Sequence, residues 1–494
     1  MKHVYLVIFD LNIEKGGKTT SLLSRAKTFN DYDIETDIIT FDYKSNYDSI
    51  INNLRSIGKL DNKTKVYNQF SFFEKRSLQK SHNNNENINN YYNNIINNNI
   101  SIEITKNKYE LFSQKSGEKI AILKYKKNSK DYILDIFDNN YRVKRIYSFT
   151  GWIRRIKEFS TDGIFKAETF FNRNGQPFLR RNINPSTQGI EDIYLLSENQ
   201  HFNNNKELGS YFISNLIEDK SSNIIICDGT GSLNKVINTT HSHVQKYAVM
   251  HTTHKTPTGK IKKVEENVLN NSKNLTGIVF LTQDYIDDVK EEYNIKNAYL
   301  IPNFIKEIPE NYEASPKKIV GCISRLSAGK GFDLLIEVAK LVSKEDAEIE
   351  FHIYGEGDYK EKIIEMIKDN HLENTVKLYG YTIHPYETLS NFRCVISTSQ
   401  SEVQSLSMIE GMLAGKPIIA FDIKYGPSQF IFNNQNGYLI PNKDVQSMAD
   451  AVIDIMHDTN KYIKFGEESR EIVLKEFNPS NIVNQWLKVF NDNL

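Results

Sequence analysis

The segment SQSEVQSLSMIEGMLAGKPIIAFD, residues 399–422, carries the strongest signal in the sequence. It places Glu402 on the loop after an apolar strand-like run and Glu410 one or two turns into the helix that follows. On that spacing both carboxylates can face one cleft, about two turns apart along the helix axis. Carboxylates accept hydrogen bonds from sugar hydroxyls, so the pair is a candidate sugar site. The alternative is two solvated charges on a helix face, which is the common case for such a pair.

A parallel α/β pattern surrounds this segment. Apolar runs such as KIVGCISR (318–325) alternate with amphipathic helical runs such as FDLLIEVAKLVSK (332–344). The first run ends in Arg325, and Lys330 follows beside Gly331 at the start of the helix. A guanidinium that binds bidentately and a compact ammonium at a strand end suit a diphosphate. Two solvated surface cations are the open alternative.

The chain also begins with an α/β pattern. KHVYLVIF (2–9) predicts a buried strand, and EKGGKTTSLLSRA (14–26) holds Gly16 and Gly17 just before a helix. A P-loop needs a glycine six positions before its lysine, where this sequence has Asn12, so an ATP site is disfavoured. The two glycines still allow a close backbone turn, with the helix N–H groups facing outward as an anion site.

The pattern changes between residues 75 and 205. An asparagine tract at 83–99 is threaded with tyrosine and isoleucine, which predicts a partly ordered helix. Short alternating segments follow, and NRNGQ (172–176) between two of them is a hairpin signal. We therefore expect an antiparallel β-rich insertion. The α/β pattern returns at 221–232 and continues to 297–305, with ligand-facing loops at the strand ends.

Composition narrows the class of protein. The chain has 494 residues, 39% of them hydrophobic, and a formal net charge of +0, so no global charge indicates a nucleic-acid partner. The first apolar stretch spans about eight residues, whereas a membrane span needs about twenty. Three cysteines, Cys227, Cys322 and Cys394, lie in apolar runs without CxxC spacing and are expected as reduced core thiols. We expect a cytoplasmic protein without a transmembrane segment.

Two features raise the question of a metal. HSH (241–243) and HTTH (251–254) place four histidines close together, but no carboxylate or thiol completes a clear zinc ligand set. Asp31 and Asp33 form an Asp-x-Asp pattern in a connection between a helix and a strand, away from any predicted ligand edge. We expect no catalytic metal and no cofactor.

The order of five motifs then points to a family. Arg325, Lys330 with Gly331, the amphipathic helix, IYGEG, the two glutamates and GKPIIA together resemble the retaining, two-domain nucleotide-sugar glycosyltransferases that include sucrose synthases and bacterial-type glycogen synthases. The resemblance covers both α/β portions and implies the GT-B fold: α/β, two Rossmann-like domains facing a cleft, with the antiparallel β-rich insertion in the N-terminal domain. The implied divisions are 1–74 and 206–305 for the N-terminal domain, 75–205 for the insertion, 306–475 for the C-terminal nucleotide-sugar-binding domain, and 476–494 for a helix packing back on the first domain.

The resemblance also implies residue roles. Arg325 and Lys330 would neutralise the diphosphate as it leaves, where charge develops in the transition state. Glu402 would accept hydrogen bonds from the donor-sugar hydroxyls and Glu410 from the ribose hydroxyls, and His251 would reach toward the sugar. The glycine turn would then cradle the phosphates of a nucleotide-sugar, and Gly355, Gly357 and Tyr381 would line the base pocket. The full implied donor-binding set is Gly16, Gly17, Asn303, Gly355, Gly357, Tyr381, Ser405, Leu406, Ser407 and Glu410.

A narrower resemblance covers the whole chain. KGGKTTSLLSRAKTF, DIITFDYKSNYDSII, the β-rich insertion, IICDGTGS, FHIYGEG and AFDIKYGPSQFI occur in the order typical of the wall teichoic acid α-glycosyltransferase (TarM-like) family. That resemblance implies retaining transfer of a hexose from a UDP-sugar to poly(ribitol phosphate), a polyanion, in α linkage. It also implies a homotrimer built through the insertion, and a cytoplasmic enzyme at the inner membrane face.

Three points stay open at this stage. Val403 and Ser405 stand where the family usually has small residues, which favours UDP-glucose over UDP-N-acetylglucosamine as donor. A second enzyme reading is an O-glycosyltransferase of serine-rich adhesins that works with a partner protein. A third reading, of another class, is a sugar-binding scaffold that has lost turnover, which the presence of both cations and both glutamates argues against.

Overall fold

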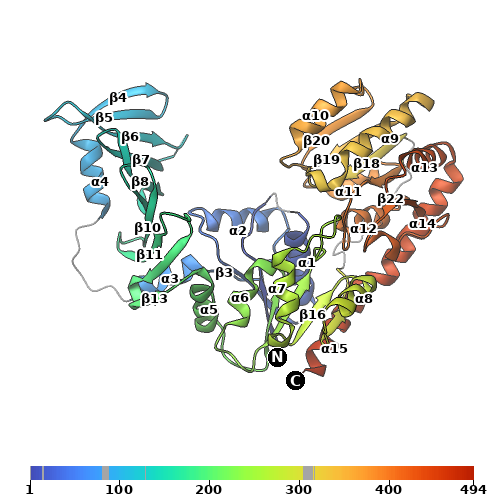
Figure 1. Ribbon diagram of the computed structural model, residues 1–494, viewed down its shortest axis with the longest axis horizontal. Helices are drawn as coiled ribbons and strands as arrows, with labels where there is room; N and C mark the ends of the chain where they lie inside the picture. Colours follow the sequence, from blue (N-terminus) through green and yellow to red (C-terminus); the bar gives the residue numbers. More distant parts are fainter. Residues whose placement is uncertain are drawn as a thin grey trace.

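The computed structural model describes residues 2–13, 16–79, 88–127, 129–303, 315 and 317–493. These residues form two parallel sheets and one long antiparallel sheet (Figure 1). The predicted fold class, two Rossmann-like domains with an antiparallel insertion in the first, is therefore confirmed. The predicted boundary between 305 and 306 and residues 80–87 of the predicted insertion lie outside the described residues.

The first parallel sheet has the strand order β17-β16-β15-β14-β1-β2-β3. Its central strands are buried on both faces because helices cover both sides, which is why their sequences read as continuous apolar runs. The strands are β1 (His3–Val7), β2 (Glu35–Thr40), β3 (Val66–Asn68), β14 (Asn223–Cys227), β15 (Gln245–Met250), β16 (Gly277–Phe280) and β17 (Ala298–Leu300). The helices of this domain are α1 (Lys18–Asp31), α2 (Tyr47–Ser56), α5 (Asn205–Leu216), α6 (Leu233–Ile237), α7 (Lys263–Asn270) and α8 (Gln283–Glu292).

The insertion is a ten-stranded antiparallel meander in which each strand pairs with its neighbour in sequence. The predicted hairpin at 172–176 joins β10 to β11, and the asparagine tract contains helix α4, so both predictions are confirmed. The strands are β4 (Ile100–Thr105), β5 (Lys108–Phe112), β6 (Lys119–Tyr125), β7 (Tyr132–Asp138), β8 (Tyr141–Phe149), β9 (Trp152–Phe159), β10 (Phe165–Phe171), β11 (Pro177–Ile183), β12 (Ile190–Leu195) and β13 (Gln200–Phe202). Helices α3 (Gln69–Gln79) and α4 (Ile88–Asn97) lead into the sheet.

The second parallel sheet has the order β20-β19-β18-β21-β22-β23. It belongs to the C-terminal domain and has its own core. The strands are β18 (Ile319–Ile323), β19 (Glu350–Tyr354), β20 (Val376–Gly380), β21 (Cys394–Ser397), β22 (Ile418–Asp422) and β23 (Gly437–Pro441). The helices are α9 (Phe332–Glu345), α10 (Lys360–Asp369), α11 (Pro385–Ser390), α12 (Leu406–Leu413), α13 (Val445–His457) and α14 (Thr459–Glu476).

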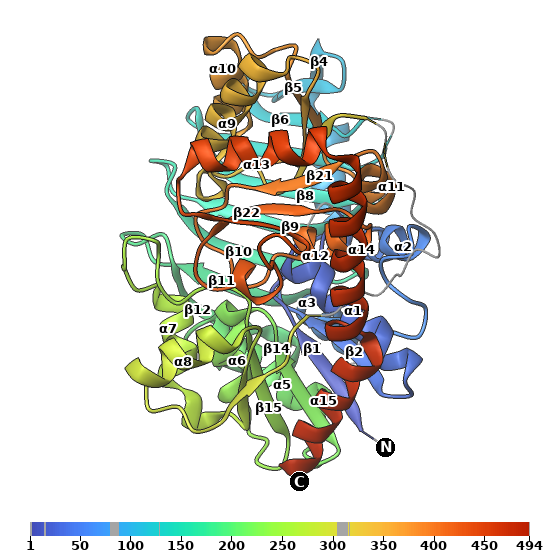
Figure 2. The ribbon, with the colours of Figure 1, turned by 90° about the vertical axis from the view of Figure 1, so that its right-hand side faces the viewer.

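The last helix, α15 (Pro479–Asp492), returns to the first domain, so both chain ends lie at the base of that domain (Figure 1). Its Trp486 is buried against Phe29 of α1, with ring centroids 6.1 Å apart. Seen from the side, α12 of the second domain lies directly above α1 of the first (Figure 2). Within the described residues, no helix combines the length and the apolar run that crossing a bilayer requires.

The three cysteines are buried free thiols, as expected from the sequence. Burial raises the pKa of each thiol, at Cys227, Cys322 and Cys394, to about 12. None is therefore poised as a thiolate nucleophile.

Candidate active site

The carboxyl edge of the second sheet joins Lys330 to Glu402. Lys330 Nζ forms an ion pair with Glu402 Oε1, and Ser399 Oγ donates a hydrogen bond of 2.9 Å to the same oxygen. Gly331 makes this approach possible, because a Cβ there would lie 2.1 Å from the carbonyl oxygen of Thr398 and its φ is +67°. Both side chains keep some exposure, 26% for Lys330 and 14% for Glu402, so a ligand can reach them.

A small pocket opens at this edge, between the ends of β18 and β21. Its rim is polar and includes Lys330, Glu402 and the hydroxyls of Ser405 and Ser407, whereas buried Met408 contributes to an apolar floor. Both serines belong to the predicted donor-binding set and stand at the start of α12. The helix N-terminus adds unpaired backbone N–H groups, which favour a negatively charged ligand.

Arg325 stands on the loop after β18 and is exposed. Two predicted glycines shape this loop: a Cβ at Gly355 would lie 1.8 Å from the carbonyl oxygen of Ser324, and one at Gly357 would lie 2.0 Å from that of Leu326. These glycines therefore let the segment after β19 cross the Arg325 loop at backbone contact distance. Their predicted place in a base pocket stays a prediction.

Glu410 and Tyr381 meet a residue of the first domain that the sequence did not single out. Lys59 Nζ donates hydrogen bonds to Tyr381 Oη at 2.7 Å and to the carbonyl oxygen of Ile13 at 3.2 Å. Burial raises the pKa of Glu410 to about 7, and the positive charge of Lys59 opposes that rise. Lys59 thus connects Tyr381 of the second domain to Ile13, in the segment that leads into the glycine turn.

The glycine turn lies at the start of α1. Gly16 and Gly17 are exposed, and Gly17 adopts φ +56°, a conformation that side chains rarely take, just before α1. In α1, Ser21 Oγ donates a hydrogen bond to Asn303 Oδ1, and Asn303 N–H donates one of 2.8 Å to Gln404 Oε1. Asn303 is therefore the link between the first turn region of α1 and the loop that carries Glu402. The convergence of the glycine turn with Arg325 and Lys330 on one diphosphate stays a prediction.

His251 ends β15 and is held by two residues that sequence reasoning missed. Its Nε2 donates a hydrogen bond of 2.7 Å to Asp228 Oδ1, and Arg25 Nη1 of α1 donates one of 2.6 Å to the same oxygen. Burial lowers the pKa of His251, and Arg25 and His251 hold that of Asp228 below its ordinary value despite its burial. A neutral imidazole with Nε2–H bound to Asp228 presents Nδ1 as an acceptor.

A signal for Asp228 was present in the sequence, since it follows the buried run NIIIC directly at a predicted ligand edge. Arg25 gave none, because an arginine in an amphipathic helix is normally expected on the solvent face. In the structure both side chains are almost fully buried, with Arg25 at 3% exposure and Asp228 at 0%.

Three of the four clustered histidines bond to different carboxylates, and among the described residues His241 Nε2 is buried without a hydrogen-bond partner. His243 bonds Asp219, His254 Nε2 bonds Glu292, and His251 bonds Asp228. Within the described residues, one grouping has metal-ligand spacing, formed by His3, Glu35 and Asp37 at the opposite, amino edge of the first sheet. There His3 Nε2 already bonds Asp37 Oδ2 at 2.9 Å. That the enzyme works without a metal stays a prediction.

A second link ties the two domains together beside Glu402. The rings of Tyr285 in α8 and Tyr425 stack with centroids 4.5 Å apart, and Lys424 pairs with Asp288 at 2.7 Å. Tyr425 N–H donates a hydrogen bond of 2.6 Å to the carbonyl oxygen of Glu402. The backbone of the Glu402 loop is thereby fixed relative to the first domain.

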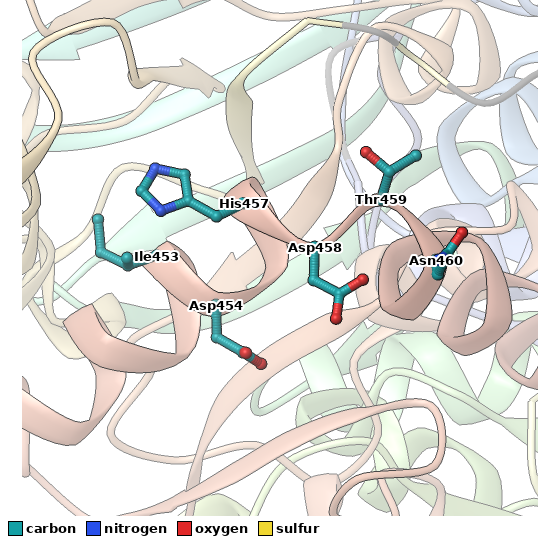
Figure 3. Close-up of a pocket in the computed structure, with 6 residues that line it drawn as sticks. All are labelled: Ile453, Asp454, His457, Asp458, Thr459 and Asn460. Carbon is teal, nitrogen blue, oxygen red and sulfur yellow. The ribbon is translucent and has the colours of Figure 1, made fainter.

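An open hollow elsewhere in the second domain does not join this site. It lies where α13 meets α14 and is lined by Ile453, Asp454, His457, Asp458, Thr459 and Asn460 (Figure 3). His457 Nε2 bonds Asp346 Oδ2 at 2.9 Å, and Asp346 precedes β19 at the amino edge of the sheet. The candidate active site is at the carboxyl edge, on the other side.

Comparison with known proteins gives a consistent result. A family model described as "Glycosyl transferases group 1" matches residues 303–472. The poly(ribitol-phosphate) alpha-N-acetylglucosaminyltransferase of Staphylococcus aureus (strain COL) is 39% identical over 496 residues, which cover 99% of this chain and 100% of the relative. The poly(glycerol-phosphate) alpha-glucosyltransferase of Bacillus subtilis (strain 168) is 26% identical over 99% of this chain and 74% of its own length.

Solved structures agree. The crystal structure of the S. aureus TarM G117R mutant with fondaparinux, alpha-GlcNAc-glycerol and UDP superposes with a TM-score of 0.95 at 38% identity, covering 99% of this chain and 100% of that one. The pneumococcal O-GlcNAc transferase GtfA superposes with a TM-score of 0.76 at 18% identity, covering 100% and 99%, which shows a shared fold.

Proposed function

The chain belongs to the TarM-like family of group 1 glycosyl transferases, and from this premise we propose that it transfers N-acetylglucosamine from UDP-N-acetylglucosamine to poly(ribitol phosphate) in α linkage. One observation carries the proposal: Lys330 pairs with Glu402 on a loop whose Gln404 is joined through Asn303 to Ser21 of α1, the helix that follows the glycine turn. A site at this junction would offer cations and backbone N–H groups to a diphosphate and a carboxylate to sugar hydroxyls.

The proposed donor sugar differs from the one that the sequence favoured. The preference for glucose required Val403 and Ser405 to narrow the sugar pocket. Val403 is 2% exposed and packs with the first-domain core, whereas Ser405 does line the pocket. The relative at 39% identity is an N-acetylglucosaminyltransferase and the one at 26% a glucosyltransferase, which supports N-acetylglucosamine as the donor sugar. UDP-glucose is the alternative donor.

Each site residue has a proposed role in the reaction. Arg325 and Lys330 bind the diphosphate and stabilise the charge that develops as it leaves. Glu402 accepts hydrogen bonds from donor-sugar hydroxyls, and its ion pair with Lys330 places both on one pocket rim. His251, fixed by Asp228, offers Nδ1 to a sugar hydroxyl. No protein nucleophile is assigned: the acceptor hydroxyl attacks on the face that the phosphate leaves, and a phosphate oxygen takes its proton.

The direct test is a donor panel. The purified protein is incubated with poly(ribitol phosphate) and each of several UDP-sugars, and the product is analysed by mass spectrometry and by NMR of the anomeric proton. We expect one added N-acetylhexosamine mass per modified ribitol, in α configuration. Faster transfer from UDP-glucose than from UDP-N-acetylglucosamine would show that glucose is the donor sugar. Transfer only to a serine-rich peptide, in the presence of a partner protein, would show that the acceptor is a peptide.

Glu402→Gln tests the assigned chemistry. The amide keeps the shape but loses the charge, so kcat is expected to fall by about 100-fold or more while UDP binding, measured by calorimetry, changes little. The matched control is Glu365→Gln, whose carboxylate pairs with Lys362 on the surface of α10. Unchanged kcat in Glu402→Gln would show that the charge of Glu402 has no part in the mechanism.

The proposal extends to assembly and location. Support for a homotrimer through the insertion comes from β4, an edge strand on which every residue is exposed and which carries Ile100, Ile102 and Ile104 on one face. Location in the cytoplasm at the inner membrane face remains a prediction from sequence.

A further inference from the structure

Lys235 in α6 is a buried cation outside the site described so far. The residue is 7% exposed, and its ammonium lies 4.3 Å from the centroid of the Phe41 ring and 5.3 Å from that of Phe9. Lysine is almost never buried to this extent unless a carboxylate or another anion faces it. Ring faces attract a cation, but they do not supply the countercharge.

Within the described part of the chain, Lys235 Nζ has no hydrogen-bond acceptor and no carboxylate partner, and the ammonium itself keeps some contact with solvent. Other basic residues have carboxylate partners: Arg154 of the insertion pairs with Glu74 at 2.8 Å, and Lys255 pairs with Glu292. Burial lowers the pKa of Lys235 to about 8, and Arg181 and Lys206 lie close enough to lower it further. The recess therefore holds a positive potential that no described side chain neutralises.

A glycine in the neighbouring helix gives the Lys235 side chain its space. Gly209 of α5 lies directly against its side chain, since a Cβ at Gly209 would be 2.4 Å from Lys235 Cδ and 2.7 Å from Cγ. A glycine in the middle of a helix costs about 1 kcal/mol relative to alanine. Here it leaves the space through which Lys235 reaches the two rings.

The recess lies on the acceptor side of the active site. Phe9 and Phe41 follow β1 and β2 directly, so they stand at the carboxyl edge of the first sheet. At the same edge, Asp228 N–H donates a hydrogen bond of 3.0 Å to the carbonyl oxygen of Val7, two residues before Phe9. Asp228 in turn holds His251. The recess therefore lies at the ends of β1 and β2, and β14, which carries Asp228 at its end, separates it from His251 after β15.

We propose that Lys235 Nζ, in the recess formed by Phe9 and Phe41, binds a phosphodiester oxygen of the acceptor chain and so positions the neighbouring polyol unit beside His251. This inference rests on the proposed function. A lysine ammonium is a compact point charge that suits a phosphate. Phe9, which is 54% exposed, gives the carbon chain of the polyol an apolar surface.

The test compares Lys235→Met with the wild type, using poly(ribitol phosphate) and UDP-N-acetylglucosamine. We expect KM for the polymer to rise about tenfold, since one charge-assisted hydrogen bond is lost. The affinity for UDP and the slow hydrolysis of the donor by water are expected to stay unchanged, because those report the diphosphate site. Raising the salt concentration should weaken polymer binding less in the variant than in the wild type.

Two further variants make the result specific. Gly209→Ala keeps every charge but displaces the Lys235 side chain, and it should reproduce the rise in KM. Lys220→Met removes an exposed lysine at the opposite edge of the same domain and should leave KM unchanged. Thermal unfolding checks that each variant is folded.

A polymer KM within twofold of wild type in Lys235→Met would overturn the inference while leaving the transferase activity intact. If the wild type transfers no sugar to the polymer, the proposed function fails instead. Binding of poly(ribitol phosphate) in the presence of UDP, measured by calorimetry, then decides about Lys235, and equal affinity in wild type and variant rejects it.

Discussion

At the residue scale, two glutamates of one motif lie in different surroundings. Glu402 pairs with Lys330 and accepts a hydrogen bond from the hydroxyl of Ser399. Glu410 lies eight positions on, where burial raises its pKa to about 7. The ordinary value is 4.5, so Glu410 is protonated over a range in which most carboxyls are ionised. The two residues share a motif but not an environment.

This difference predicts a pH effect on stability. Because the folded protein binds the Glu410 proton more tightly than the unfolded chain does, the stabilisation is fully present below pH 4.5 and is lost as the pH rises through about 7. Glu410→Gln has no such proton. Thermal unfolding should therefore show wild type losing stability relative to Glu410→Gln between pH 5 and pH 8. Parallel profiles for the two proteins would contradict the raised pKa.

At the element scale, short turns rather than helix faces position the ligand groups. Gly17 caps α1 at φ +56° and ψ −116°, and nothing lies within 4 Å of where its Cβ would be. The need for glycine there is thus conformational and not steric. The same turn places the first N–H groups of α1 toward the cleft, which a helix beginning with an ordinary residue would not do in this geometry.

Gly17→Ala should raise KM for the UDP-sugar by about tenfold or less, because the strain of about 1 kcal/mol is relieved by moving the turn away from the phosphates. Steady-state kinetics with a fixed acceptor concentration measure this. Gly163→Ala is the matched control: its φ is +82°, its Cβ position is equally open, and it lies in a hairpin of the insertion. The same rise in KM for the control would show a global effect.

At the scale of the whole molecule, one helix joins the end of the chain to the catalytic groups. Trp486 of α15 packs against Phe29, and Arg25 lies over its ring at 5.1 Å from the centroid. Arg25 binds Asp228, which binds His251. The C-terminal helix therefore supports the histidine through two intermediate side chains, although it contacts no ligand group itself.

Trp486→Ala should destabilise the fold by about 3–5 kcal/mol, since a large aromatic side chain leaves a cavity in a packed core. The variant should also lower activity at a temperature where it remains folded, because Arg25 loses its packing surface. Denaturant unfolding and assays at that temperature measure both effects. Lys488→Ala, on the exposed side of the same helix, should change neither.

The exposed isoleucines of the insertion lead to a prediction about the oligomeric state of the protein. Ile102→Lys on β4 places a charge in the exposed row of isoleucines and should convert the proposed trimer to monomers, which light scattering detects. Glu103→Lys changes charge on the opposite face of that strand and should leave the trimer intact. A wild-type protein that is already monomeric would reject the trimer itself.

The sequence by itself determined the alternation of strands and helices, the antiparallel insertion and the motif residues Arg325, Lys330, Glu402 and Glu410. It could do so because apolar periodicity shows which segments are buried, and because parallel strands carry their polar ends to one edge. Helix α4 within the asparagine tract was predictable for the same reason.

Only the tertiary structure decided which distant side chains meet. Arg25 and Asp228 are 203 positions apart, and Lys59 and Tyr381 are 322 apart. The hydrophobic periodicity of the sequence did not predict that Arg25 or Lys235 would be buried, since a charged residue in a helix is normally solvated. Whether a charge is buried, and what it faces there, depends on how separate elements pack against one another, and that information is not local in the chain.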